Sequence, residues 1–317
     1  MKLKQFGVAD TFGVPAPSEM KVEGYEDATH PRIPVMKNGY VFRREALRDV
    51  LAFLGNPRGD GLFLSGPTGA GKTSLIAQVA ARLNWPVESV TCHGRMELSD
   101  LVGQFALVQG ETVFIHGPLA VAVRDGHLLV LNEIDLADPA ELAGLNDIVE
   151  GQPLVIAANG GEVIRPHPRF RLVVTGNSAG AGDTSGLYQG VKRQNIAFMD
   201  RFRFTTVAYP SVEDETEILD RTAPDFPDVL RESLIKVAGE IRRLFMGEDG
   251  AELSLTMSTR TLVRWANLAT VFRGAPNALE YALDGALTAR AEPEEREAIH
   301  RIAKDVFGTA WERGDGS

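Results

Sequence analysis

One octapeptide of the chain has the residue types and spacing of a phosphate-binding loop. Residues 66–73 read GPTGAGKT and fit the pattern G-x-x-x-x-G-K-[ST]. Glycines let successive backbone N–H groups face phosphate oxygens at the positive end of a helix, where Lys72 would reach the terminal phosphates and Thr73 would ligate Mg²⁺. The alternative is a glycine loop that merely joins a strand to a helix. Contact with a nucleotide is expected from Gly66, Pro67, Thr68, Gly69, Ala70, Gly71, Lys72, Thr73 and Ser74.

A second polar group follows the apolar run 128–131. Glu133 lies at the end of this predicted strand, where it would orient or deprotonate an attacking water. Asn132 stands where nucleotide hydrolases of this kind normally carry an aspartate, and its amide keeps an oxygen acceptor but loses the charge. We therefore expect Thr73 and Asn132 to hold Mg²⁺ weakly, with Asp135 as a compensating carboxylate. The alternative is that Glu133 is a solvated loop acid.

Three further side chains complete the candidate set. Asn177 ends the apolar run 171–176 and would hold the water or contact the γ-phosphate, although such a residue alone is usually part of a turn. Arg201, with Arg203 as the alternative, is a candidate to stabilise charge during phosphoryl transfer; an ordinary surface pair with Asp200 is the competing interpretation. Arg260 lies in the first turn of a predicted helix, where a cation opposes the helix dipole, so it either meets an anion or has no special role.

The elements that must position these residues divide the chain into three regions. Residues 1–37 contain four prolines and no sustained periodicity, which predicts an extended arm. In residues 38–210, short apolar runs alternate with helical patterns, which predicts an α/β core with a parallel sheet. Residues 211–317 show only amphipathic helical patterns and predict an all-helical domain. The helices expected there are 212–221, 227–246, 258–272, 277–290 and 293–313.

Composition excludes several classes of protein. The 317 residues suggest about two domains, and 44% apolar residues suffice for an ordinary core. The net charge of −10 argues against nucleic acid as the main partner, because phosphate binding draws on a basic surface. Cys92 is the single cysteine, so the chain has no disulfide framework and no CxxC site. The start lacks the apolar segment of a signal peptide, and no apolar run approaches a membrane span, so we expect a cytoplasmic protein.

Together these elements resemble the AAA+ ATPases over about residues 38–270. The resemblance implies a P-loop NTPase fold, with a three-layer α/β core followed by a helical lid domain. It assigns residues 66–73 as Walker A, Glu133 as the Walker-B glutamate and Asn177 as sensor 1. It also assigns Arg201 as the arginine finger and Arg260 as sensor 2.

More narrowly, the chain is similar to the MoxR branch, and within it to the CobS subunit of aerobic cobaltochelatase and the CbbQ and NorQ activators. Asn132 departs from the aspartate of that family. The most specific stretch is 182–188 (GDTSGLY), followed by 199–201 (MDR). Further stretches that carry the resemblance are 6–15, 80–86, 100–103 and 163–168.

The resemblance implies ATP and Mg²⁺ as ligands and a homo-oligomeric ring, typically a hexamer, in which a neighbour donates the arginine finger. It also implies a partner with a von Willebrand factor A domain, and a client that is remodelled or loaded with metal. Hairpins expected at 107–115 and 154–164 would face the ring pore, unless they are ordinary hairpins of the core. Two alternatives to this ring-forming ATPase remain: the ATPase subunit of a cobaltochelatase, and an ATP-binding scaffold or switch with little turnover.

Overall fold

The computed structural model describes residues 2–182, 190–247 and 253–313 of the chain. Contacts within it divide the chain into two compact units. The first unit consists of residues 1–37, 42–67 and 72–207, and the second consists of residues 38–41, 68–71 and 208–317. Two short segments from the first part of the sequence are therefore grouped with the C-terminal helices.

The first unit is built on a five-stranded parallel sheet with the strand order β11-β3-β10-β7-β4. Its strands are β3 (Gly61–Ser65), β4 (Val87–Thr91), β7 (Leu128–Asn132), β10 (Arg171–Gly176) and β11 (Phe202–Thr206). The three central strands are buried along their whole length. Strands covered on both faces have continuous apolar runs, which is why the sequence pattern predicted a parallel sheet correctly.

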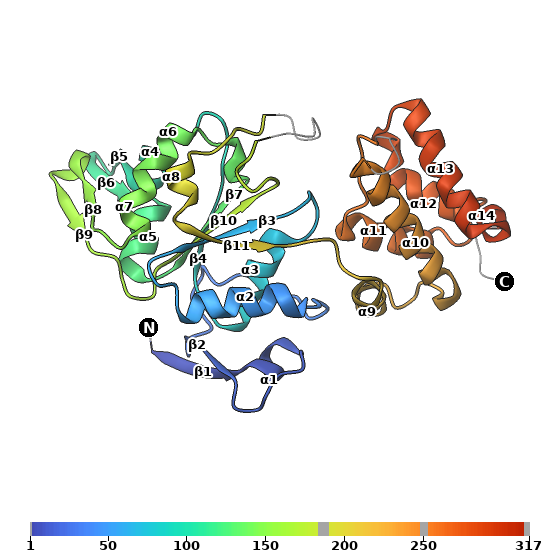
Figure 1. The fold of residues 1–317 in the computed structure, drawn as a ribbon, viewed down its shortest axis with the longest axis horizontal. Coiled ribbons are helices and arrows are strands. Elements are labelled where there is room, and N and C mark those ends of the chain that lie inside the picture. Colours follow the sequence, from blue (N-terminus) through green and yellow to red (C-terminus); the bar gives the residue numbers. More distant parts are fainter. Residues whose placement is uncertain (1, 183–189, 248–252, 314–317) are drawn as a thin grey trace. The chain divides into compact units, whose positions relative to one another are not determined.

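Helices cover both faces of this sheet (Figure 1). They are α2 (Arg44–Gly55), α3 (Lys72–Arg82), α4 (Leu98–Val102), α5 (Pro118–Asp125), α6 (Pro139–Leu142), α7 (Asn146–Val149) and α8 (Ile196–Met199). Figure 1 shows α2 and α3 on one side of the sheet and α5, α6 and α7 on the other. The predicted three-layer α/β core is thereby confirmed.

The N-terminal arm contains short regular elements: β1 (Leu3–Gly7), α1 (Val8–Phe12) and β2 (Lys21–Tyr25), with the two strands antiparallel. The arm is tied to the core through Tyr25. The Tyr25 backbone N–H donates to the Leu83 carbonyl at 2.8 Å. The Tyr25 hydroxyl and the Trp85 indole N–H both donate to the Gly126 carbonyl, at 3.2 and 3.0 Å. A Cβ on Gly24 would lie 2.3 Å from the Leu83 carbonyl oxygen, so the arm lies against the core backbone at a glycine.

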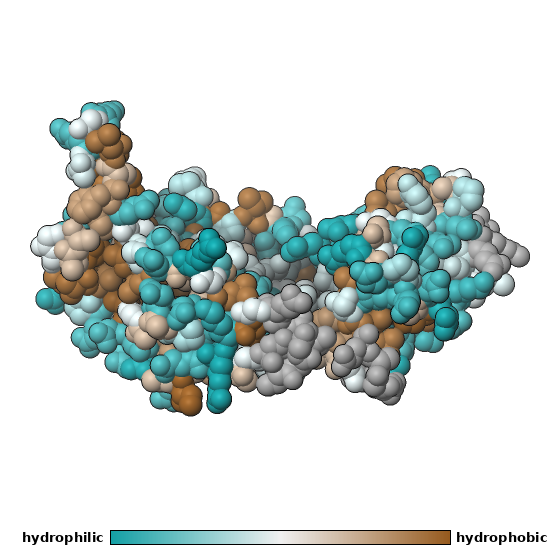
Figure 2. Space-filling model, turned by 90° about the horizontal axis from the view of Figure 1, so that it is seen from above, coloured by the Kyte–Doolittle hydropathy of each residue, from teal (hydrophilic) through white to brown (hydrophobic). Residues whose placement is uncertain are grey.

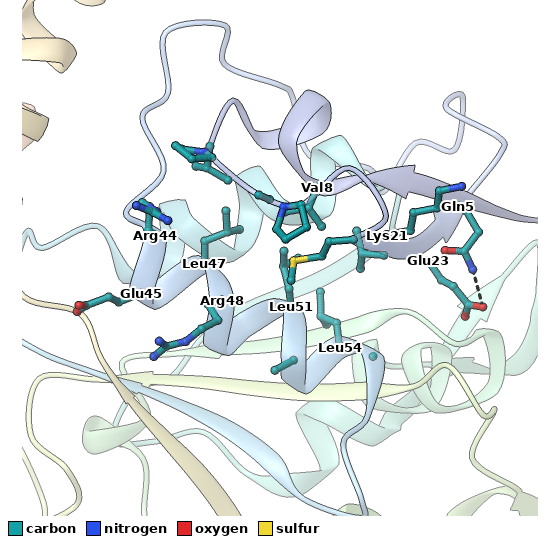
Figure 3. A pocket seen from close by; sticks show the side chains of 18 of the residues that line it. Gln5, Val8, Lys21, Glu23, Arg44, Glu45, Leu47, Arg48, Leu51 and Leu54 are labelled. Carbon is teal, nitrogen blue, oxygen red and sulfur yellow. Dashed lines mark hydrogen bonds between the residues drawn. The ribbon is translucent and has the colours of Figure 1, made fainter.

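A cavity of about 890 Å³ lies between the arm and α2. Figure 3 shows Leu47, Leu51 and Leu54 of α2 along one wall, with Val8 of the arm opposite them. Its lining includes none of the residues expected to contact a nucleotide. This cavity is therefore lined by residues other than those of the phosphate loop.

Two β-hairpins extend from the first unit, and each stands where a hairpin was predicted. Their strands are β5 (Gly103–Val108), β6 (Glu111–His116), β8 (Leu154–Ile156) and β9 (Glu162–Ile164). Gln109 and Gly110 have φ values of 54° and 90°, the positive values that a two-residue hairpin turn of type I′ requires. His116 Nε2 lies 2.8 Å from Glu162 Oε2, which joins the two hairpins.

These hairpins carry exposed apolar side chains on an otherwise mixed surface. Figure 2 shows hydrophobic surface at the left end of the first unit, where Figure 1 places the hairpins. The exposed apolar residues are Phe105, Leu107, Val108, Val113, Ile115, Val155 and Val163. Exposed patches of this kind commonly mark interaction surfaces.

The second unit is helical, as predicted for the C-terminal part of the chain. Its helices within the described residues are α9 (Val212–Thr222), α10 (Asp228–Phe245), α11 (Thr259–Val271), α12 (Ala278–Ala286), α13 (Pro293–Phe307) and α14 (Thr309–Arg313). Trp265, Ile241 and Leu283 are fully buried in its core. Gly308, with a φ of 56°, divides the single helix expected over 293–313 into two. No helix in the described ranges is both long and apolar enough to cross a membrane.

Candidate active site

The polar residues singled out in the sequence lie at the carboxyl ends of adjacent strands. β10 pairs with β3 on one side and with β7 on the other, all parallel. The loops that follow these strands therefore leave the sheet at the same edge. They carry the phosphate loop after β3, Glu133 after β7 and Asn177 after β10. The topology thus brings together three segments that are far apart in the sequence.

The phosphate loop begins at a glycine that no other residue could replace without movement. Gly66 has a φ of 146°, and a Cβ there would lie 2.2 Å from the Val207 carbonyl oxygen. At the other end of the loop, Lys72 opens α3 and turns its ammonium group back. The Lys72 Nζ donates to the carbonyls of Gly66 and Pro67 at 2.7 and 3.0 Å. The lysine thereby closes the base of its own loop.

Asn177 connects the lysine to the glutamate of the neighbouring strand. The Lys72 Nζ donates to Asn177 Oδ1 at 2.9 Å, and Asn177 Nδ2 donates to Glu133 Oε2 at 3.0 Å. Lys72 is 6% exposed, and this burial lowers the pKa of its ammonium group, while the nearby Glu133 and Asp135 carboxylates oppose that shift. A cation, an amide and a carboxylate from three strand ends therefore form one hydrogen-bonded chain.

Glu133 adopts a backbone conformation that is unusual for its residue type. Its φ and ψ values of 55° and 44° lie in the left-handed helical region. Its backbone N–H donates to the Thr175 hydroxyl on β10 at 3.3 Å. Non-glycine residues held in this region are concentrated at functional sites, because the surrounding structure must compensate for the strain.

Thr73 and Asn132 present oxygen atoms to each other. The Thr73 hydroxyl donates to Asn132 Oδ1 at 2.7 Å, and Asn132 Nδ2 donates to the Ser89 hydroxyl on β4 at 3.0 Å. Mg²⁺ takes oxygen ligands, and it usually keeps several waters and substrate phosphates beside one or two protein groups. A hydroxyl and an amide oxygen fit this requirement. Among the described residues, no group of three or more His, Cys, Asp or Glu side chains forms a metal cluster.

Asp135 contacts the backbone that follows β10. Asp135 is only 1% exposed, and its Oδ2 accepts hydrogen bonds from the N–H groups of Asn177 at 2.7 Å and Ser178 at 3.0 Å. Burial raises the pKa of this carboxyl, and the two N–H donors oppose the increase. A Cβ on Gly176 would lie 2.7 Å from Asp135 Oδ2, so the carboxylate and the strand end are in close contact. The position of Asn177 depends on this contact.

The two candidate arginines near β11 are held differently. Arg201 follows α8, and its Nη2 lies 2.6 Å from Glu150 Oε1, while Nη1 also contacts the Ala197 carbonyl. Arg203 on β11 is bound to Asp60 at 2.6 Å and to the Pro57 carbonyl at 2.6 Å. Both guanidinium groups therefore have partners within the first unit, and Arg201 pairs with Glu150.

Arg260 lies in the second unit, in the first turn of α11. Ser258 caps this helix, because its hydroxyl accepts a hydrogen bond from the Thr261 N–H at 3.1 Å. The Arg260 side chain is exposed. The GDTSGLY stretch that carried part of the family resemblance lies, from Asp183 onward, outside the described residues.

Sequence reasoning missed two residues that support this site. Ser89 fixes the orientation of the Asn132 amide, and Thr175 binds the Glu133 backbone. Both are hydroxyl residues within strands, where a short polar residue usually has only a packing role. The strand pairing that places them beside Asn132 and Glu133 is a tertiary feature, so the local pattern contained no signal for them.

Two family models match two consecutive regions of the chain, first the α/β part and then the helical part. Residues 61–202 match the model described as AAA domain (dynein-related subfamily). Residues 215–306 match the model described as CbbQ/NirQ/NorQ C-terminal. The α/β part and the helical part therefore each have relatives among known proteins.

Several curated proteins are similar over most of the chain. The aerobic cobaltochelatase subunit CobS of Sinorhizobium sp is 35% identical over 275 residues, covering 84% of this chain and 80% of that protein. Protein NorQ of Paracoccus denitrificans (strain Pd 1222) is 32% identical, with 78% and 86% covered. Protein CbbQ of Hydrogenophilus thermoluteolus is 29% identical, with 78% and 87% covered. The similarity thus extends over both units.

Proposed function

The chain belongs to the MoxR-like AAA+ ATPases and is an ATP hydrolase, and we propose that it uses hydrolysis to remodel a partner protein or load it with metal. The observation that carries the proposal is the hydrogen-bonded chain from Lys72 through Asn177 to Glu133. The relatives CobS, NorQ and CbbQ support an action on another protein. CobS is named as one subunit of a cobaltochelatase.

Lys72 and the amides of the phosphate loop bind the phosphates in this proposal. Thr73 and Asn132 hold Mg²⁺ through their facing oxygens. When bound, Mg²⁺ draws negative charge from the phosphate oxygens. Because Thr73 and Asn132 are both neutral, these two side chains bring no negative charge to the ion.

Glu133 and Asn177 position the attacking water. The carboxylate of Glu133 accepts a proton from that water, and Asn177 orients it from the neighbouring strand end. Asp135 holds the backbone of Asn177 in place. The burial of its carboxylate favours this positioning role for Asp135 over direct contact with Mg²⁺.

Arg201 and Arg260, which do not belong to the loops after β3, β7 and β10, are the proposed arginine contacts to the phosphates. We assign Arg201 to the site of a neighbouring subunit in a homo-oligomeric ring, the hexamer usual in this family. Arg201 would leave Glu150 and contact the phosphates bound by that subunit. Arg260 would couple the γ-phosphate to the position of the helical unit, because it lies in the first turn of α11. The ring would work in the cytoplasm.

The two hairpins are the proposed contact with the partner or its client. Their apolar side chains are exposed, with Leu107 at 76% and Phe105 at 54%. The partner expected in this branch carries a von Willebrand factor A domain. With a net charge of −10, the chain is a poor candidate for binding nucleic acid, so a protein remains the expected client.

The decisive experiment uses Glu133→Gln in the full chain. This variant keeps the shape of the side chain but removes the base, so ATP binding persists and turnover falls at least about 100-fold. The trapped complex should then retain the partner during purification. Lys72→Ala should lose both nucleotide and partner, and Glu232→Gln, an exposed change on α10, is the matched control. Intact turnover in both Lys72→Ala and Glu133→Gln would refute the mechanism.

Two narrower functions have specific observations behind them. The similarity to a cobaltochelatase subunit favours a role as the ATPase of such an enzyme, and reconstitution with the other subunits, with cobalt insertion as the readout, tests it. Asn132 favours an ATP-binding switch with little turnover, because the neutral amide holds Mg²⁺ weakly. Measuring turnover beside ATP affinity separates that switch from a motor.

A further inference from the structure

Tyr209 contacts the phosphate loop and the segment before α11 within the second unit. Its hydroxyl donates to the Thr68 carbonyl at 2.8 Å and lies 3.0 Å from the Thr256 hydroxyl. A carbonyl can only accept, and a tyrosine hydroxyl has a single proton to donate. Thr256 therefore donates to Tyr209, and Tyr209 donates to Thr68.

The contact with Thr68 fixes the direction of a peptide group in the phosphate loop. A peptide unit is planar, with its C=O and N–H pointing in opposite directions. When Tyr209 holds the Thr68 carbonyl, the N–H of Gly69 must face the opposite side. Loops of this kind bind phosphate through such N–H groups, so the tyrosine determines whether this donor is available.

Gly69 itself lies against the start of α11. Its φ is 76°, and a Cβ at this position would lie 2.3 Å from the Cβ of Ser258, the residue that caps the helix. The tip of the loop therefore has little room to rotate. Tyr209 and Ser258 restrain the same peptide group, one by a hydrogen bond and the other by contact.

A buried ion pair holds Tyr209 in place. The guanidinium carbon of Arg242 lies 4.6 Å from the centre of the Tyr209 ring. Arg242 donates to Glu215 through two bonds of 2.9 and 2.7 Å and to the Met257 carbonyl through one of 2.6 Å. Arg242 is 6% exposed and Glu215 is 1% exposed. Because both charges are buried and paired, the Arg242 side chain has one defined position against the ring.

We propose that Tyr209 is a positioning residue for ATP binding, which orients the Thr68–Gly69 peptide so that its N–H faces the phosphates. Arg242 and Glu215 hold the tyrosine ring, and Thr256 holds its hydroxyl. This inference rests on the proposed binding of ATP phosphates by the loop. It adds a requirement beyond the loop itself: a tyrosine outside the loop must hold the Thr68 carbonyl.

Tyr209→Phe in the full chain tests the proposal. A donor that binds phosphate equally in the ground state and the transition state affects KM and leaves kcat largely unchanged. We expect the KM for ATP to rise about five- to tenfold and kcat to change less than about twofold. Tyr281→Phe, which alters a 58% exposed tyrosine of α12, is the matched control and should leave KM unchanged. A KM for Tyr209→Phe within about twofold of the wild-type value would overturn the proposal.

A second pair of variants tests the same hydrogen-bond chain without altering the tyrosine. Thr256→Val removes the donor to Tyr209, and Thr256→Ser restores it. We expect a higher KM for the valine variant and the wild-type KM for the serine variant. Equal KM values in both variants would contradict the proposed hydrogen bonds from Thr256 through Tyr209 to Thr68. This conclusion would hold even if Tyr209→Phe lowered the Tm.

Failure of the proposed function gives a different result. If Lys72→Ala binds a fluorescent ADP analogue as tightly as the wild type, the loop is not the phosphate site, whatever Tyr209 does. If Lys72→Ala loses the analogue while Tyr209→Phe keeps the wild-type KM, the phosphate site stands and the role of Tyr209 is wrong.

Discussion

The Thr73 hydroxyl donates a hydrogen bond to the side-chain oxygen of Asn132 across 2.7 Å. The Asn132 nitrogen faces away from Thr73 and donates to the Ser89 hydroxyl at 3.0 Å, so the surrounding groups define which end of the amide faces the threonine. The proposed Mg²⁺ site therefore has the neutral amide oxygen of Asn132 at the position where the family normally has an aspartate carboxylate.

Asn132→Asp should strengthen Mg²⁺ binding. The aspartate keeps the oxygen that faces Thr73 and adds a negative charge, while Ser89 can turn its proton toward the new carboxylate. We expect the Mg²⁺ concentration for half-maximal ATPase activity to fall about tenfold. Asn267→Asp, an exposed change on α11, controls for the added charge alone. An unshifted Mg²⁺ titration would exclude Asn132 as the cause of weak binding.

Lys72→Met should remove the stabilisation that ATP gives the protein. The lysine is buried, and its ammonium group contacts two carbonyls and an amide, so the site holds a positive charge suited to an anion. For the wild type, ATP at 100 times its Kd should add about 2.7 kcal/mol to the free energy of unfolding. Thermal melts with and without ATP measure this effect. The variant should show no ATP-dependent rise in Tm, whereas Lys236→Met, on the exposed face of α10, should show the full rise.

Asp135→Asn should change how stability depends on pH. Burial raises the pKa of Asp135 above its ordinary value of 3.8. The folded chain then binds this proton more tightly than the unfolded chain, so the contribution of Asp135 is greatest at low pH and is lost as pH rises through the folded-state pKa. The variant lacks this titration.

We therefore expect the free energy of unfolding of Asp135→Asn, relative to the wild type, to increase from pH 4.5 to pH 7.5. Urea unfolding at both pH values measures the difference. Asp147→Asn, which alters an exposed residue of α7, should show no such trend. A constant difference between Asp135→Asn and the wild type at the two pH values would show that the carboxyl does not titrate in this range.

Gly24→Ala should weaken the attachment of the N-terminal arm. The added Cβ would lie 2.3 Å from the Leu83 carbonyl oxygen, in backbone that is fixed by the bond between Tyr25 and Leu83. We expect a loss of about 1–3 kcal/mol in the free energy of unfolding, measured with urea. Gly55→Ala has open space around its Cβ and is the control. Equal stability of the two variants would mean that the arm is not held at Gly24.

The strand ends of the candidate site could be predicted because two simple rules combine. Continuous apolar runs mark buried parallel strands, and parallel strands end at one edge of the sheet. These rules placed Lys72, Glu133 and Asn177 near one another, and the hydrogen bonds among them are consistent with that prediction. The roles assigned to these residues in catalysis remain predictions.

The direction of Asp135 could not be predicted from the same rules. Its carboxylate contacts the Asn177 backbone because Glu133 takes a φ of 55° and a turn of 3₁₀ helix, Ile134–Leu136, follows. A run of residues after a strand does not encode that backbone angle. The contacts of Tyr209 with Thr68 and of Tyr25 with Gly126 were equally inaccessible, because each joins residues more than 100 positions apart.

The place of β10 in the sheet has a consequence for how the chain folds. β3 and β7 do not pair with each other, since β10 lies between them and hydrogen-bonds to both. During synthesis on the ribosome, each of these strands has an open edge until residues 171–176 emerge. Such non-local pairing slows folding and leaves aggregation-prone edges for chaperones to protect. The insertion of β10 therefore joins β3 to β7 and brings the strand ends of the nucleotide site together in the same step, before β11 pairs with the other edge of β3.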